Sequence, residues 1–183
     1  MISIEQPAMV LNAVTSPRIG RLQMWNSWDV SGATTARQII DWVATVARGA
    51  EGGKLKNLVI HSHGIPGAIL IGQGFNRNNV GLFSGLSGLV DKIWLVACRP
   101  AYIDPSCNTT TGTGVCVSDG NMFVSAMARA ASCYVVASTE TQTELNQTYP
   151  FGVITTYEGL VLSYGPAGNV TWSRRYPSQW QGE

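Results

Sequence analysis

Both histidines of the chain lie in one short stretch, NLVIHSHGIPGAILIG (residues 57–72). His61 and His63 follow an apolar run, and Gly64 comes directly after His63. An imidazole can act as a general base or as a metal ligand. A second stretch, IWLVACRP (residues 93–100), places Cys98 directly after an apolar run, thirty-five positions after His63. A cysteine attacks as its thiolate and needs a base or a cation nearby, so the two stretches together predict nucleophilic chemistry.

Three short apolar blocks must position these groups. Continuous apolar residues precede His61, fill positions 93–97 before Cys98, and recur in CYVVAST, which ends at Ser138 and Thr139. Such blocks are typical of strands in a sheet that is covered on both faces. In an open parallel sheet, ligands bind beyond the carboxyl ends of the strands. If the first two strands are parallel neighbours, His63 and Cys98 meet at one edge of the sheet.

Helical and strand patterns alternate along the rest of the chain. Apolar residues at three- and four-residue steps predict a helix that starts after Thr34 or Thr35 and ends at Gly49, and a second helical stripe covers 122–130. Residues 20–30 read as a first strand, and 151–177 as alternating strands with turns. We therefore predict one α/β domain over residues 1–183. It has a mostly parallel sheet, helices on both faces and a small antiparallel C-terminal extension.

Composition narrows the function classes. The chain has 183 residues, of which 45% are hydrophobic and 13% charged, and its net charge is +1. No run of basic residues favours a nucleic-acid partner. No apolar segment reaches the length of a membrane-spanning helix. The first residues, MISIEQPAMVLNAV, lack a basic region and carry an early glutamate, so they do not predict a signal peptide.

The blocks NLVIHSHG and IWLVACRP resemble the caspase-like cysteine peptidases of clan CD, which include caspases, gingipains, separases, clostripain and bacterial toxin self-processing domains. Residues 96–100, VACRP, match the caspase signature Q-A-C-[RQG]-G only in part, and the histidine-to-cysteine spacing is shorter than the roughly 50 residues of caspases. The chain is therefore not expected to be a true caspase. It is more similar to the caspase-like domain of large bacterial surface proteins, through SHGIPG (62–67) and VAST (136–139).

This resemblance, which covers about residues 20–140, implies a function and roles for three residues. The chain would be a cysteine endopeptidase that cleaves a peptide or protein substrate through a thioester and needs no cofactor. His63 would be the general base and acid, and Cys98 the nucleophile. The backbone N–H of Gly64 would bind the developing oxyanion, since glycine allows close backbone approach.

Substrate preference in such an enzyme would come from residues at neighbouring strand ends. The candidates are Ser138, Thr139 and Glu140, together with Trp25 and Asn26 of the first strand. If Glu140 faces the pocket, charge pairing favours a basic P1 side chain. The alternative is that Glu140 is a solvated loop residue.

Other interpretations concern the remaining histidine and cysteines. His61, His63 and Cys98 could bind zinc only with a further ligand. The nearest candidates, Cys107 and Cys116, lack C-x-x-C spacing, so no metal is predicted. We expect His61 to pack beside the site with a backbone hydrogen bond. Cys107 and Cys116 flank a small polar loop and form either a disulfide or two free thiols.

A second hypothesis is a non-catalytic binding or effector module on the same scaffold, because a fold does not fix a function. The two hypotheses differ in geometry. A peptidase requires the His63 ring near the Cys98 sulfur at an accessible place, whereas a cysteine sealed in the core favours the second hypothesis.

Overall fold

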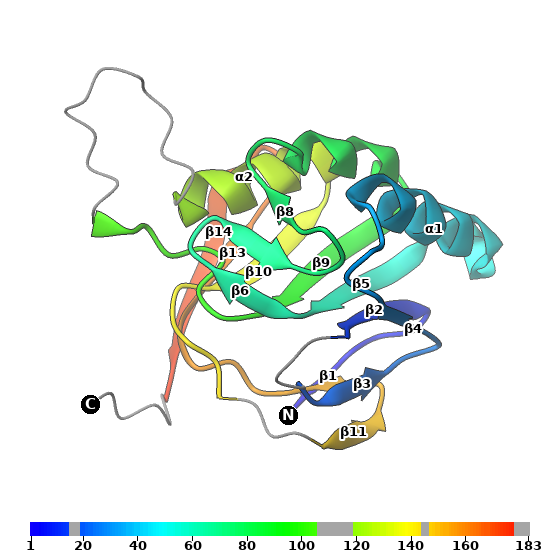
Figure 1. Ribbon diagram of the computed structural model, residues 1–183, viewed down its shortest axis with the longest axis horizontal. Helices are drawn as coiled ribbons and strands as arrows, with labels where there is room; N and C mark the ends of the chain where they lie inside the picture. The colour runs from blue at the N-terminus through cyan, green and yellow to red at the C-terminus, as the bar shows by residue number, and fades with distance from the viewer. Residues whose placement is uncertain (15–18, 106–118, 144–146, 178–183) are drawn as a thin grey trace.

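A seven-stranded mixed sheet forms the centre of the computed structural model, which describes residues 1–14, 19–105, 119–143 and 147–177 (Figure 1). Its strand order is β14-β13-β10-β9-β5-β2-β4. The strands are β2 (Ala8–Ala13), β4 (Asn26–Val30), β5 (Leu55–His61), β9 (Val90–Val96), β10 (Tyr134–Ser138), β13 (Gly159–Tyr164) and β14 (Val170–Tyr176). The five strands from β10 to β4 are parallel, and β13 and β14 are antiparallel. The predicted α/β class and the antiparallel C-terminal part are confirmed.

Shorter elements surround this sheet. They are the strands β1 (Ile2–Ser3), β3 (Arg21–Gln23), β6 (His63–Ile65), β7 (Ala68–Leu70), β8 (Phe75–Asn76), β11 (Thr148–Phe151) and β12 (Val153–Ile154), the helices α1 (Ala36–Gly49) and α2 (Gly120–Ala131), and the 3-10 helices η1 (Glu51–Gly53) and η2 (Val80–Leu86). Strands β6, β7 and β8 form a small antiparallel sheet, and β1 pairs with β12 and β3 with β11. None of the helices in the described ranges is long and apolar enough to cross a membrane.

Local sequence determines where the two α-helices start. At α1, the Thr35 hydroxyl accepts a hydrogen bond from the Gln38 N–H, and the Gln38 side chain accepts one from the Thr35 N–H. This reciprocal capping box satisfies two backbone donors that the first turn would otherwise leave open. At α2, the Asp119 carboxylate accepts from the Met122 N–H at 2.9 Å. Of the two predicted capping residues, Thr34 and Thr35, the helix uses Thr35, and its predicted end at Gly49 is confirmed.

The prediction of helices on both faces of the sheet is wrong for the described residues, because α1 and α2 cover the same face (Figure 1). The chain passes from β4 to β5, β9 and β10 in one direction across the sheet. Right-handed crossovers between parallel strands then all fall on one side. The step from β2 to β4 runs the other way, and its connection, which contains β3, packs on the opposite face.

The strand β2 and the division of residues 20–30 into β3 and β4 were not predicted. All six residues of β2 are buried, including Asn12. The Asn12 amide donates to the Leu22 carbonyl oxygen at 3.0 Å and accepts from the Leu22 N–H at 3.0 Å. A polar side chain is tolerated in this buried strand because the backbone of β3, which pairs in a different sheet, satisfies its hydrogen bonds.

Candidate active site

The two strands that lead to His63 and Cys98 are parallel neighbours. Ile60 of β5 is paired with Leu95 of β9, and His61 with Val96. The condition on which the sequence prediction depended is therefore met, and both chain segments leave the sheet at the same edge. The next residue, Ser62, still donates from its N–H to the Val96 carbonyl oxygen at 3.1 Å.

Gly64 brings the histidine segment into contact with the cysteine. A Cβ atom at Gly64 would lie 2.5 Å from the Cys98 carbonyl oxygen and 3.0 Å from the Ala97 Cβ. The residue after His63 thus packs directly on the backbone of Cys98, at a distance that only glycine permits. His63 and Cys98 are both half-buried, so neither is sealed in the core.

Hydrogen bonds connect the ends of three strands around Cys98. The Arg99 N–H donates to the Glu140 carbonyl oxygen and the Ala101 N–H to that of Ser138, both at 3.1 Å. The Gly67 N–H, in the turn between β6 and β7, donates to the Pro100 carbonyl oxygen at 3.4 Å. Arg99 has a φ of +53°, a left-handed conformation that is unfavourable for a non-glycine residue. Such strained positions cluster at functional sites, and this one directly follows the predicted nucleophile.

The backbone of Gln142 lies against the Cys98 sulfur. The Gln142 N–H points at Sγ with a nitrogen-to-sulfur distance of 3.4 Å, and Sγ lies 3.6 Å from the Gln142 carbonyl oxygen. An N–H donor at this place stabilises negative charge on the sulfur. Sequence reasoning missed Gln142, because it follows β10 in a polar segment, TQTE, that has no recognisable pattern.

The buried side chain of Gln142 holds this segment in place. Its Nε2 donates to the Ser138 hydroxyl at 3.0 Å and to the carbonyl oxygens of Glu140 at 2.9 Å and Glu158 at 3.1 Å. Its Oε1 accepts from the Glu158 N–H at 2.9 Å. One amide thus fixes the loop that presents an N–H to Cys98.

Replacing Gln142 with alanine should lower the free energy of unfolding by about 2–4 kcal/mol, because buried partners lose their hydrogen bonds. Urea denaturation measures this change. Gln73→Ala is the matched control, since the Gln73 side chain is exposed, and it should change stability by less than about 0.5 kcal/mol. Equal effects of the two substitutions would show that Gln142 does not hold the loop.

The three substrate-binding residues predicted at the end of β10 form hydrogen bonds within the protein. Ser138 is fully buried, and its hydroxyl donates to the Glu158 carbonyl oxygen and accepts from the Glu140 N–H. The Thr139 hydroxyl donates to the Leu160 carbonyl oxygen at 3.1 Å. The Glu140 carboxylate accepts from Arg175 at 2.6 Å and from the Leu160 N–H at 3.2 Å. A basic P1 side chain would have to replace Arg175 at Glu140.

Trp25 and Asn26 do not lie at the edge of the sheet that carries Cys98. Asn26 is the first residue of β4 and is paired with Met9, which is paired in turn with Leu58, near the middle of β5. Residues 20–30 were expected to form one strand, with Trp25 and Asn26 close to the site. The chain bends between β3 and β4 instead, so Trp25 precedes β4, Asn26 begins it, and the structure places both away from Cys98.

His61 has a different environment from His63. It is fully buried, and its Nδ1 lies 3.2 Å from the Asn12 Oδ1. Because the contacts to Leu22 fix the orientation of the Asn12 amide, Oδ1 is the acceptor and His61 Nδ1 the donor. This contact joins His61 of β5 to a buried side chain of the neighbouring strand β2. A bend at Ser62 separates the two histidines, so strand alternation does not relate them.

No group of three or more His, Cys, Asp or Glu residues suited to a metal ion occurs in the parts of the chain that the structure describes. Cys98 and Cys133 are free thiols. Cys107 and Cys116 lie outside the described residues, and the choice between a disulfide and two thiols there stays open.

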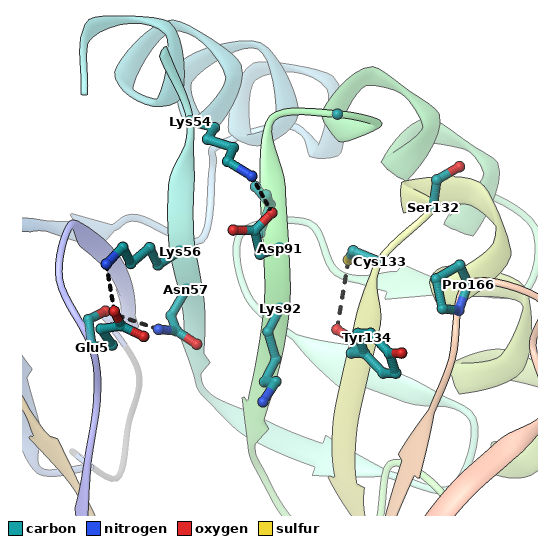
Figure 2. A pocket seen from close by; sticks show the side chains of 12 residues that line it. Glu5, Lys54, Lys56, Asn57, Asp91, Lys92, Ser132, Cys133, Tyr134 and Pro166 are labelled. Carbon is teal, nitrogen blue, oxygen red and sulfur yellow. Dashed lines mark hydrogen bonds and ion pairs between the residues drawn. The ribbon is translucent and has the colours of Figure 1, made fainter. Parts of the chain in front are cut away.

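A hollow of about 630 Å³ lies at the opposite, amino-terminal edge of β5, β9 and β10 (Figure 2). Lys54, Lys56 and Lys92 line it, and the first two of these lysines pair with carboxylates. Lys54 pairs with Asp91 at 2.8 Å, and Lys56 pairs with Glu5. The third lysine, Lys92, lies 5.2 Å from the centroid of the Trp94 ring, and the hollow is separate from His63 and Cys98.

Cys133 lines this hollow with its sulfur directed at the Tyr134 carbonyl oxygen, at 3.6 Å (Figure 2). Burial raises the pKa of the Cys133 thiol to about 12. A thiol with a raised pKa stays protonated and unreactive at neutral pH.

We expect iodoacetamide at pH 8 to leave Cys133 unmodified in the native protein and to modify it in 8 M urea, as measured by peptide mapping. Rapid native modification would contradict the buried environment.

Comparisons with known protein families, with curated proteins and with solved structures found no match to this chain. The arrangement of its residues is therefore the basis for a function.

Proposed function

We propose that the chain is a cysteine endopeptidase of caspase-like fold in which His63 and Cys98 form the catalytic dyad. The observation that carries the proposal is the juxtaposition of their segments. The strands β5 and β9 are parallel neighbours, and Gly64 contacts the backbone of Cys98. The half-buried state of both side chains supports access for a substrate.

The chemistry needs only side chains and backbone groups of this site. His63 accepts the proton of the Cys98 thiol as the sulfur attacks the carbonyl carbon of the scissile peptide bond. The carbonyl oxygen becomes an oxyanion, which the Gly64 N–H stabilises. The bond to the leaving nitrogen then breaks, and the protonated His63 gives its proton to the departing amine, leaving a thioester on Cys98.

Water completes the reaction. His63 takes a proton from the water as its oxygen attacks the thioester carbonyl, and the carbon–sulfur bond breaks. The proton returns to the Cys98 sulfur, and the product leaves as a carboxylic acid. The Gln142 N–H, 3.4 Å from Sγ, supports the negative charge on sulfur at both stages.

The proposal is tested by trapping with peptidyl acyloxymethyl ketones that vary in the P1 residue, followed by peptide mapping of the modified protein. We expect a covalent adduct on Cys98 and none on Cys133. Preference for a basic P1 would assign Glu140 to substrate recognition. If no peptidyl electrophile modifies Cys98 while the protein is folded, the non-catalytic binding module becomes the better description.

A further inference from the structure

Two tryptophans form an open corner at one edge of the sheet, away from Cys98. Trp28 lies on the edge strand β4, and Trp42 lies on the helix α1. Their ring centroids are 6.4 Å apart and their planes meet at 69°. A hollow of about 450 Å³ opens there, lined by Trp28, Thr34, Gln38, Asp41, Trp42 and Thr45.

The position of Trp42 is not explained by packing in the core. The apolar stripe of α1, which includes Ile39, Ile40 and Val43, is buried against the sheet. Trp42 lies beside this stripe and keeps 47% of its surface exposed. Trp28 is partly buried and supports the corner from the sheet side. The helix and the edge strand therefore hold the two rings in an edge-to-face relation beside an open hollow.

A carboxylate lies beside these rings. Asp41 precedes Trp42 on α1 and lines the same hollow. In the described ranges, no basic side chain forms an ion pair with the Asp41 carboxylate, although Arg37 lies one helical turn before it. The Thr45 hydroxyl donates to the Asp41 backbone carbonyl oxygen at 2.9 Å and leaves the carboxylate oxygens accessible.

Other aromatic rings of this protein already carry cations of its own. The Lys92 Nζ lies 5.2 Å from the Trp94 ring centroid, and the guanidinium groups of Arg99 and Arg174 lie over Tyr102 and Tyr176. For the residues described, no such cation covers the rings of Trp28 or Trp42. The corner thus combines two aromatic rings with a carboxylate that has no ion-pair partner among the described residues.

This arrangement fits a particular ligand chemistry. A cation is attracted to a tryptophan face when it lies within about 6 Å of the ring centroid. Because the two centroids are 6.4 Å apart, one cation can satisfy this distance to both rings. Quaternary ammonium groups are the ligands that aromatic cages recognise. They are weakly hydrated, and a neighbouring carboxylate adds charge attraction.

We propose that Trp28, Trp42 and Asp41 form a binding site for a small cation that carries a trimethylammonium group. The site is distinct from the proposed catalytic dyad and does not depend on it. Choline is the probe, since it presents this group with little else attached.

The test is a ligand-observed NMR titration of the full chain with three compounds. Choline is compared with 3,3-dimethyl-1-butanol, its neutral isostere, and with ethanolamine, its unmethylated analogue. We expect saturable binding of choline and at least about fivefold weaker binding of the other two. Equal binding of the isostere would indicate apolar contact alone, and equal binding of ethanolamine would indicate simple ion pairing. Either result, or no binding of choline, would overturn the proposal.

Variants locate the binding. Trp42→Ala and Asp41→Asn should each weaken choline binding about two- to fivefold, and both positions are exposed enough for the fold to persist. Trp172→Ala is the matched control, because Trp172 is 44% exposed on β14, and it should bind choline like the wild type. Cys98→Ala should also leave choline binding unchanged. Unaltered binding in Trp42→Ala would place the ligand elsewhere and contradict the site.

Discussion

Replacing Cys98 with alanine is expected to reduce peptide cleavage at least about a thousandfold, because the attacking sulfur is lost and no thioester can form. The free energy of unfolding should change by less than about 1 kcal/mol, since Cys98 is half-buried and its sulfur makes only weak hydrogen bonds. The measurement is kcat/KM on a peptide that the wild type cleaves, together with urea denaturation of both proteins.

Cys133→Ala is the control for this experiment. It removes the other free thiol of the described residues, which lies at the opposite edge of the sheet. It should retain cleavage within about threefold of the wild type, because Cys133 is distant from the dyad. Cleavage that survives in Cys98→Ala, or that disappears in Cys133→Ala, would remove Cys98 from the role of nucleophile.

Replacing Gly64 with alanine should reduce cleavage about a hundredfold and lower the free energy of unfolding by about 1–3 kcal/mol. The added Cβ would lie 2.5 Å from the Cys98 carbonyl oxygen and must push the β6 segment away from Cys98. His63 directly precedes Gly64 and would move with it. Gly64 does not have a positive φ, so the effect arises from this contact rather than from backbone conformation.

Gly32→Ala is the matched control, because a Cβ at Gly32 would meet no atom within 4 Å and its φ is not positive. It should leave both cleavage and stability close to those of the wild type. If Gly64→Ala cleaves peptide like Gly32→Ala, close packing of the two segments is not needed for the reaction.

Local and strongly patterned features could be predicted from the sequence. The helix α1 has an apolar stripe and a capping residue, Thr35, within the same short segment, and its limits were predicted correctly. The strands β5, β9 and β10 are short apolar blocks whose burial needs no knowledge of their partners. The sequence analysis predicted that the segments carrying His63 and Cys98 meet if β5 and β9 are parallel neighbours. The pairing of these two strands confirms that condition.

Features that depend on contacts between different elements could not be predicted. The strand β2 contains Asn12, whose burial is tolerated only because Leu22 of β3 satisfies its amide. The side of the sheet that each helix covers follows from the order of the strands in the sheet. No local pattern in the sequence predicts that order. Gln142 contacts Cys98 across forty-four positions, and no local pattern marks it.

The central claim, that His63 activates Cys98, is tested most directly by the rate at which iodoacetamide modifies Cys98 at pH 7 in the wild type and in His63→Gln. Peptide mapping separates Cys98 from the other cysteines. We predict that the substitution slows modification of Cys98 at least about tenfold while the protein stays folded, because the thiolate loses its base and counterion. Equal rates in the two proteins, or a native Cys98 that does not react, would contradict the dyad.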